Sequence, residues 1–442
     1  MREAVAPPER LSDYDEGLPF PAPPPEVPER FAELRRERPA APLHRIGEVV
    51  VVVSSSRGGS TLLAELLRRV PGLVTLPGEL NAHVAIARGA RHDRARVLLD
   101  EIAREAGAPA EGVPPSGRDE LVTACRWRLL AQWPDVDVDA TRLAGWVDDA
   151  LAGTGGDRRE AWADDGAAFT VALLAAVRAE HPQVDPWRYD LPAELVARCF
   201  PGLPRPAGPP SLPVIEMAPY RLFRPWLAAG EELATGGRLV LVTPRNCYRL
   251  DHLAALLPHA RLRVLHLTRN PAAAVNGLLD GWHDPGFFAG TVDRPLRIGG
   301  WSDVHPWGDR WWSFDLPPEW ESVAGAGLAE VAALQWRSAH AAALAFVRRT
   351  SCDHLRIRHE DVLAGGDRCA ATMRRLAEWL DVDPAPLVGA AERGVRPVMA
   401  TAAPRPRRWE ASADRLAAAL GDPDVWALVP ALGYGLDPGE WV

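Results

Sequence analysis

An apolar run, a Ser/Gly turn and an amphipathic segment follow one another directly at residues 48–67, "EVVVVVSSSRGGSTLLAELL". Five consecutive valines predict a strand buried on both faces, as in a parallel sheet that helices cover on each side. The leucines that follow recur at helical spacing, so a helix is expected after the turn. A strand, a glycine-containing turn and a helix in this order favour an α/β fold.

The rest of the chain continues this alternation. Strand patterns recur at 238–244, 261–271 and 354–363, and helical patterns at 327–350 and 369–382. These elements predict a three-layer α/β fold around a central parallel sheet. We expect a Pro-rich N-terminal arm at 1–45 and one domain over 46–442. This domain would contain a helical insertion at about 84–210 and a Trp-rich loop at about 282–320.

The turn between the first strand and helix predicts an anion site. Backbone N–H groups and the positive end of the helix dipole gather at such a turn. Gly58 and Gly59 allow the backbone to curl around an anion, Ser60 and Thr61 offer hydroxyl donors, and Arg57 adds a permanent charge. The alternative interpretation is an ordinary strand-to-helix connection.

The parts of a nucleotide-hydrolysing loop are missing from this turn. The GxxxxGK[ST] pattern is absent, and all 50 basic residues of the chain are arginine. No clear magnesium-binding acid follows a second apolar strand. A loop of this kind can hold a phosphate without metal-assisted phosphoryl transfer, so no metal is expected.

Composition limits the remaining classes. The net charge of −9 argues against a general nucleic-acid binder, and no apolar run reaches the roughly 20 residues that a membrane span needs. The five cysteines are scattered and lack metal-ligand spacing, which favours free thiols in a reducing compartment. The N-terminus has no signal-peptide pattern. We expect a cytoplasmic protein.

Four segments, in order, resemble sulfotransferases that use 3′-phosphoadenosine 5′-phosphosulfate (PAPS). "SSSRGGSTLLAELL" is similar to the family's 5′-phosphosulfate loop, and "VLHLTRNPAAAVNGLLDGW" to its second motif. "LRIRHEDVLAGGDRCAATMRRLAEWLDV" resembles the later Tyr-Glu-Asp-Leu segment with its helix, and "RPRRWE" the C-terminal basic loop. The resemblance covers about residues 46–85 and 238–410.

This resemblance implies a P-loop fold and sulfuryl transfer from PAPS to a hydroxyl or an amine, without a metal. It implies that Arg57 is catalytic and that residues Gly58, Gly59, Ser60 and Thr61 hold the 5′-phosphosulfate. Arg269 would grip the 3′-phosphate, and Arg405, Arg407 and Arg408 would close over the donor.

One position departs from the family pattern. The family has a serine eight residues after the motif arginine, and this chain has Gly277, preceded by Asn276. Three outcomes are open: Asn276 substitutes for the serine, the Gly277 amide approaches the phosphate, or the contact is absent.

The acceptor side needs a base that takes the proton of the attacking hydroxyl. Some bacterial family members carry a glutamate in the segment that corresponds to "LPGELNAH", so Glu79 is the first candidate and His83 the second. Glu79 as a helix cap and His83 as a surface residue are the alternatives. His266 lies in an apolar strand and is expected to be a core histidine.

The Trp-rich segment suggests either a lid with an apolar acceptor site or a loop fastened by its own aromatic side chains. Similar family members act in bacterial natural-product pathways, some of them on carrier-tethered chains. A small-molecule or carrier-bound acceptor in secondary metabolism is therefore the expectation.

Two other functions remain open at this stage. A P-loop kinase or nucleotide hydrolase would require magnesium. A sulfotransferase-like binding protein would bind the donor product without turnover. The sequence leaves the acceptor and the oligomeric state open.

Overall fold

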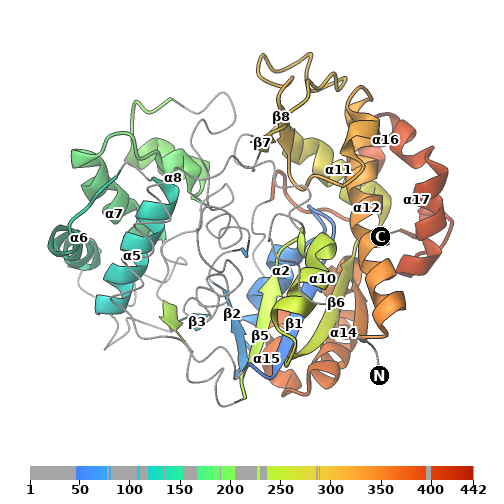
Figure 1. Cartoon of the computed structure of the whole chain (residues 1–442), viewed down its shortest axis with the longest axis horizontal. Helices are drawn as coiled ribbons and strands as arrows, with labels where there is room; N and C mark the ends of the chain where they lie inside the picture. The colour runs from blue at the N-terminus through green and yellow to red at the C-terminus, as the bar shows by residue number, and fades with distance from the viewer. Residues whose placement is uncertain are drawn as a thin grey trace.

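The structure, a computed structural model, describes residues 46–76, 79–80, 107–109, 118–133, 136–152, 167–189, 191–204, 226–228, 236–284, 287, 289–394 and 400–441. The predicted arm at 1–45 lies outside these residues. At the centre is a seven-stranded sheet with the order β4-β3-β2-β5-β1-β6-β9 (Figure 1). Its strands are β1 (Glu48–Val53), β2 (Leu73–Thr75), β3 (Gly107–Pro109), β4 (Trp226–Ala228), β5 (Arg238–Val242), β6 (Arg261–Thr268) and β9 (Asp353–Arg358).

The five strands β2, β5, β1, β6 and β9 are all parallel, which confirms the predicted central sheet. In the register of β1, Val51 pairs with Leu241 on one side and with Val264 on the other. β3 and β4 extend the sheet beyond β2 in antiparallel pairing. They lie in and just after the segment predicted to be helical, and three-residue strands are too short to give a periodic sequence signal.

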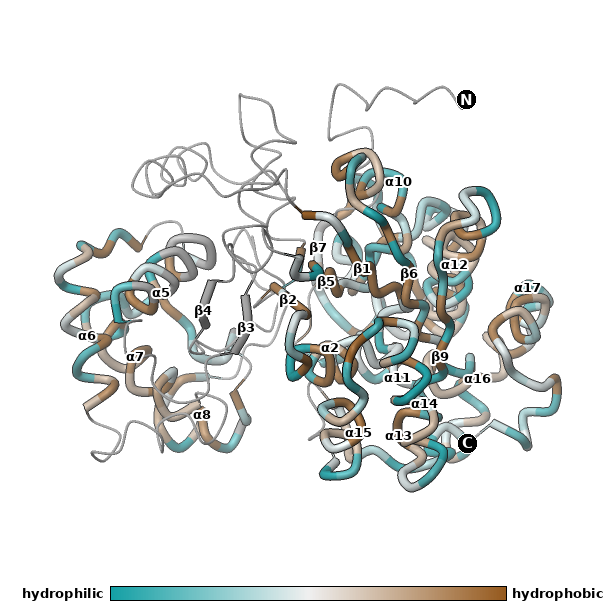
Figure 2. The backbone as a smooth tube through the Cα atoms, turned by 90° about the horizontal axis from the view of Figure 1, so that it is seen from below, coloured by the Kyte–Doolittle hydropathy of each residue, from teal (hydrophilic) through white to brown (hydrophobic). Residues whose placement is uncertain are grey.

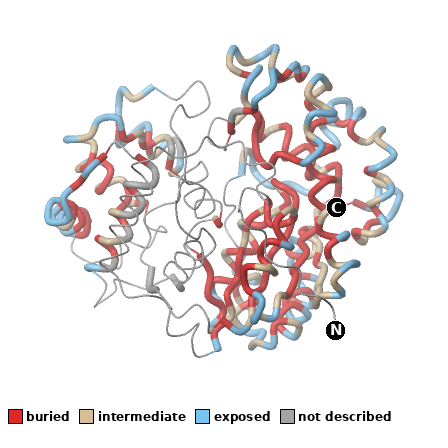
Figure 3. Tube along the Cα trace, viewed as in Figure 1, coloured by how far each residue is buried: buried red, intermediate tan, exposed pale blue. Residues whose placement is uncertain are grey.

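The valines of β1 alternate between the two faces of the sheet and are all fully buried. Val49, Val51 and Val53 pack with α10 (Asn246–Leu256) and α12 (Leu328–Thr350). Val50 and Val52 pack with α2 (Ser60–Leu67), α14 (Gly366–Leu380) and α15 (Pro384–Glu392). This is the predicted three-layer arrangement, and the sheet is its buried centre (Figure 3).

Helices from the predicted insertion stand together at one side of the molecule (Figure 1). They are α5 (Arg118–Gln132), α6 (Ala140–Ala152), α7 (Ala167–Glu180) and α8 (Ala193–Cys199). Apolar residues are spread along α6 and α7 (Figure 2), and Leu143, Val147 and Leu173 among them are fully buried. Residues 84–106, where another helix was predicted, lie outside the described part.

A third apolar cluster joins α11 (Pro271–Trp282), α12, α16 (Ala413–Leu420), α17 (Pro423–Leu428) and the Trp-rich segment, residues 282–320. This segment was predicted to be a loop, but it contains the hairpin of β7 (Ala289–Thr291) and β8 (Trp311–Ser313). Trp282 packs edge-on against Trp301 and Trp312, and all three rings are buried. Within the described residues, no helix has the length and apolar character needed to cross a membrane.

Candidate functional site

The predicted site residues follow the carboxyl ends of neighbouring strands. β1 lies beside β6, and the chain leaves β1 toward β2 but leaves β6 toward β9. Ligands of open α/β sheets bind where neighbouring connections diverge in this way. The glycine loop, residues 54–61, follows β1, and Arg269 follows β6.

The glycine loop turns tightly and has no room for side chains at either glycine. Gly58 N donates to Ser55 O at 3.0 Å, and Arg57 takes the left-handed conformation with φ 61°. A Cβ on Gly58 would lie 2.0 Å from Ser54 Oγ. Gly59 has φ 97°, and a Cβ there would lie 2.2 Å from His359 Nδ1. Left-handed backbone at a non-glycine residue costs about 1–2 kcal/mol and is typical of functional sites.

Gly59 is the N-cap residue of α2 and, having no side chain, leaves the first helical turn without a side-chain cap. Uncapped N–H groups at a helix start present partial positive charge to an anion. Ser60 in this turn is buried and Thr61 is half-buried. This turn therefore has a backbone geometry that suits an anion, and binding of an anion here stays a prediction.

Arg269 reaches the glycine loop from the end of β6. Asn270 caps α11 by accepting from Ala273 N at 2.8 Å, and Pro271 occupies the first helical turn. These two residues end the strand and start the helix, which leaves Arg269 at the junction. Its Nη1 donates to the backbone oxygen of Arg57 at 2.8 Å, which joins two motifs 212 residues apart.

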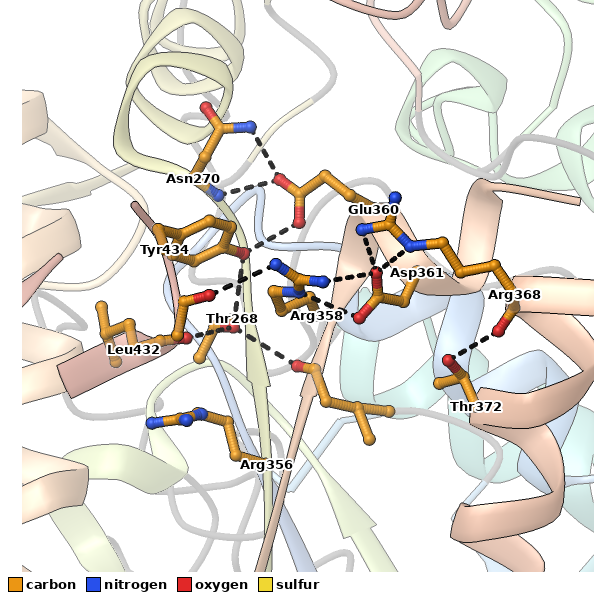
Figure 4. Close-up of polar contacts among 12 residues, drawn as sticks. Thr268, Asn270, Arg356, Arg358, Glu360, Asp361, Arg368, Thr372, Leu432 and Tyr434 are labelled. Atoms are coloured by element: carbon orange, nitrogen blue, oxygen red, sulfur yellow. Dashed lines mark hydrogen bonds and ion pairs between the residues drawn. The ribbon is translucent and has the colours of Figure 1, made fainter. Parts of the chain in front are cut away.

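A buried polar network fixes both sides of Arg269 (Figure 4). Glu360 accepts from Asn270 N at 2.9 Å, from Asn270 Nδ2 at 2.7 Å and from the Tyr434 hydroxyl at 2.8 Å. The Tyr434 hydroxyl also lies 3.3 Å from Thr268 Oγ1. Trp336 Nε1 donates to the backbone oxygen of Arg269 at 3.0 Å. The C-terminal tail thus helps to orient a residue of the second motif.

Positive charge accumulates between the glycine loop and α11. Burial, and after it the charge of Arg269, lowers the pKa of Arg57 to about 10. Burial also lowers the pKa of Arg269, and Arg408 adds to the shift while Glu360 opposes it. Buried arginines that repel one another favour an anionic ligand, because the ligand's negative charge relieves their repulsion.

The three C-terminal arginines take different positions. Arg408 binds Asp280 of α11 at 2.6 Å, within electrostatic reach of Arg57 and Arg269. Arg405 and Arg407 are exposed, and Arg407 pairs with Glu410. Their role at the donor stays a prediction.

The face of α11 beside Arg57 carries Gly277, which lets the helix lie close to both motif arginines. A Cβ on Gly277 would lie 3.4 Å from Arg57 Cβ and 3.6 Å from Arg269 Nη1. Asn276 is buried, and its Oδ1 finds no hydrogen-bond partner among the described residues. The Arg57 guanidinium lies over the ring of Phe287, with its Cζ 4.4 Å from the ring centroid. Gly277, where the chain departs from the family pattern, therefore lies beside both motif arginines, Arg57 and Arg269.

The predicted base is near the same edge. Glu79 is half-buried after β2, and the next residue, Leu80, donates its N–H to Thr243 Oγ1 at 3.2 Å, just beyond the end of β5. His83 lies outside the described residues. His266 is fully buried and contacts His340 at 2.8 Å, as expected for a core histidine.

Sequence reasoning missed two residues that touch the glycine loop. His359 packs against Gly59, and burial followed by the charge of Arg269 lowers its pKa to about 3. Asp315, from the Trp-rich segment, accepts a hydrogen bond from the Ser56 hydroxyl. His359 lies within the third family-like segment, which is the signal that marks it, whereas no local pattern marks Asp315. In the described ranges, no group of histidine, cysteine, aspartate and glutamate side chains is arranged to hold a metal ion.

Comparison with known proteins gives one family. The family model described as "Sulfotransferase family" matches residues 49–280, just over half of the chain, from β1 through the face of α11 beside Arg57. No curated protein and no solved structure gives a significant match.

Proposed function

Because this chain belongs to the sulfotransferase family, we propose that it transfers a sulfuryl group from PAPS to a hydroxyl or an amine. The proposed acceptor is a small molecule or a carrier-bound chain of secondary metabolism. The observation that carries the choice of donor is the hydrogen bond from Arg269 to the Arg57 backbone. It brings the predicted 3′-phosphate arginine against the predicted 5′-phosphosulfate loop.

The residues present fit a bis-anionic nucleotide. Gly58 and Gly59 allow a tight turn in which a Cβ would clash with Ser54 and His359, and the turn leads into the start of α2, which has no side-chain cap. Arg57 and Arg269 supply two buried positive charges, one beside the glycine loop and one at the end of β6, while Arg408 pairs with Asp280 nearby. A donor with phosphates at both the 5′ and 3′ positions matches this distribution.

When bound, PAPS supplies the sulfuryl group and a phosphate leaving group. We propose that Gly58 to Thr61 hold the 5′ end through backbone N–H groups and hydroxyls. Arg57 stabilises the negative charge that develops on the leaving phosphate, and Arg269 holds the 3′-phosphate. The acceptor oxygen gains its bond to sulfur, the bond from sulfur to the phosphate oxygen breaks, and Glu79 takes the acceptor proton.

The first experiment is calorimetric titration with the product 3′-phosphoadenosine 5′-phosphate (PAP), compared with AMP, ADP and magnesium-ATP. We expect tight binding of PAP that weakens strongly without the 3′-phosphate and does not depend on magnesium. Preference for magnesium-ATP would favour a kinase or hydrolase. Binding of PAP without transfer of sulfate to any acceptor would favour a binding protein.

Single variants separate the proposed roles. Arg269→Ala should weaken PAP binding roughly 10- to 100-fold, because a hydrogen bond to a charged group contributes about 1.5–3 kcal/mol. Arg57→Ala should lose transfer far more than PAP affinity, and Glu79→Gln should bind PAP normally but turn over slowly. Arg349→Ala is the matched control, because Arg349 forms an exposed pair with Asp251. Equal PAP affinity in wild type and Arg269→Ala would remove the 3′-phosphate assignment.

A further inference from the structure

Asp315 is a buried carboxylate at the junction of the Trp-rich segment and the glycine loop. Its exposure is 1 %. One carboxylate oxygen accepts a hydrogen bond from the Ser56 hydroxyl, and the other accepts one from the Tyr248 hydroxyl at 3.2 Å. Ser56 directly precedes Arg57, the residue in the left-handed conformation. A side chain 259 residues away in sequence therefore holds the glycine loop at its turn.

The backbone around Asp315 is itself fixed from several sides. Trp312 Nε1 and Gln335 Nε2 donate to the backbone oxygen of Asp315 at 2.8 and 2.7 Å. Gln335 Nε2 also donates to Ser313 O at 2.9 Å, and Arg245 Nη2 donates to Phe314 O at 2.6 Å. These bonds anchor residues 313–315 to α12 and to Arg245, the N-cap residue of α10, so the backbone that carries the Asp315 carboxylate is fixed without the glycine loop.

Stability alone does not account for a carboxylate at this position. Burial raises the pKa of Asp315, while its bond from Ser56 and the charge of Arg245 act in the opposite direction. A buried ionic group is often no more stabilising than a well-packed apolar residue of similar volume. A benefit specific to the loop explains the carboxylate better than a general contribution to folding.

We propose that Asp315 is a positioning residue: acting through Ser56, it holds the glycine loop in its anion-binding conformation and couples that loop to the Trp-rich segment. The role in donor binding rests on the proposed function, whereas the ordering of the loop does not. The two can therefore fail separately.

The test is hydrogen exchange of the amides in residues 54–61 without ligand, with PAP affinity as the second readout. Asp315→Leu keeps the branching at Cγ but is larger and accepts no hydrogen bond. We expect its loop amides to exchange about tenfold faster and its PAP dissociation constant to rise about tenfold, as loss of one hydrogen bond to a charged group implies. Its melting temperature should fall, because the buried hydroxyls of Ser56 and Tyr248 lose their acceptor. A merely structural role would lower the melting temperature in the same way but leave exchange in the loop no more affected than exchange in the rest of the protein.

The conservative variant provides a rescue. Asp315→Asn keeps one acceptor oxygen for Ser56, so its loop exchange should stay within about threefold of wild type. Glu319→Gln is the matched control, because Glu319 lies in the same segment but its carboxylate accepts from Ser338 on α12 at 3.1 Å. It should leave loop exchange unchanged.

The route through Ser56 is tested by a double-mutant cycle. Ser56→Ala should loosen the loop as Asp315→Leu does, and the double variant should be no looser than either single one. Additive effects, or a folded Asp315→Leu protein with unchanged loop exchange, would overturn the proposal. If Asp315→Leu does not fold, unchanged loop exchange in Ser56→Ala overturns it. If wild type binds no PAP, the proposed function fails, and the exchange data still decide the role of Asp315.

Discussion

The glycine loop (residues 54–61) and the Trp-rich segment (residues 282–320) lie against each other but are held in place by different means. The loop depends mainly on its own backbone, with Asp315 and Arg269 as distant anchors: it has two glycines without room for a Cβ, a left-handed arginine and an uncapped helix start. The Trp-rich segment depends on side chains from elsewhere, above all Gln335, which binds Trp282, Ser313 and Asp315. A backbone-built region tolerates no change at its glycines, whereas a region built on side chains depends on a few distant partners.

The largest effect is expected from Gly59→Ala. Alanine at φ 97° is strained, and its Cβ would lie 2.2 Å from His359 Nδ1. Strain and overpacking together predict a loss of roughly 2–5 kcal/mol in the free energy of unfolding, with loss of measurable PAP binding. Chemical denaturation and calorimetry measure the two effects.

Gly72→Ala is the matched control, because Gly72 has φ 80° but a Cβ there meets nothing within 4 Å. It should lose only the part of the free energy of unfolding that backbone strain accounts for, about 1–2 kcal/mol, and keep its PAP affinity. Equal losses in both variants would show that His359 does not constrain the loop.

The next largest effect is expected from Gln335→Met, which tests whether distant side chains hold the Trp-rich segment. Gln335 is fully buried, and its loss leaves two carbonyls and the Trp282 indole N–H without this partner. Unsatisfied buried groups predict a loss of roughly 2–4 kcal/mol in the free energy of unfolding, measured in urea. Arg294→Ala, which breaks an exposed pair with Glu321, should change that free energy by less than about 0.5 kcal/mol. A small effect of Gln335→Met would mean that the aromatic packing alone holds the segment.

Acid should destabilise the fold through buried neutral histidines. Burial lowers the pKa of His359, beside the loop, and of His340, on α12, to about 3. The unfolded chain binds a proton near pH 6.5 and the folded chain does not until about pH 3, so stability falls as pH drops through this window. Each such histidine contributes a slope of about 1.4 kcal/mol per pH unit between roughly pH 4 and 6.

Urea unfolding at pH 7.5, 6 and 5 measures this slope. His359→Gln and His340→Gln should each flatten it by a similar amount, because both side chains are buried to a similar degree. An unchanged slope in either variant would show that its histidine is not kept neutral by the fold.

Much of the fold could be predicted because its signals are local. Five valines and a glycine turn each act within a few residues, so the parallel sheet followed from local patterns, whereas Arg269 was found through the resemblance to the family's second motif. The short strands β3 and β4 and the hairpin β7–β8 could not be predicted, since three residues carry no periodicity. Asp315 and Tyr434 touch the site through contacts of long sequence separation, and no spacing rule marks such residues.

The smallest effect, and the sharpest test of the departure from the family pattern, is expected from Gly277→Ser. A Cβ at this position has ordinary contact distances of 3.4 Å to Arg57 and 3.6 Å to Arg269, so a serine fits between the two arginines. It should gain about 0.5 kcal/mol of helix propensity and raise PAP affinity roughly three- to tenfold through one added hydrogen bond. Gly281→Ser, four residues along the same helix, is the contrast, because its Cβ would lie 2.5 Å from Phe314 Cζ and should destabilise the fold. An unchanged PAP affinity in Gly277→Ser would mean that the 3′-phosphate does not approach this turn of α11, and that Arg269 serves the glycine loop more than the donor.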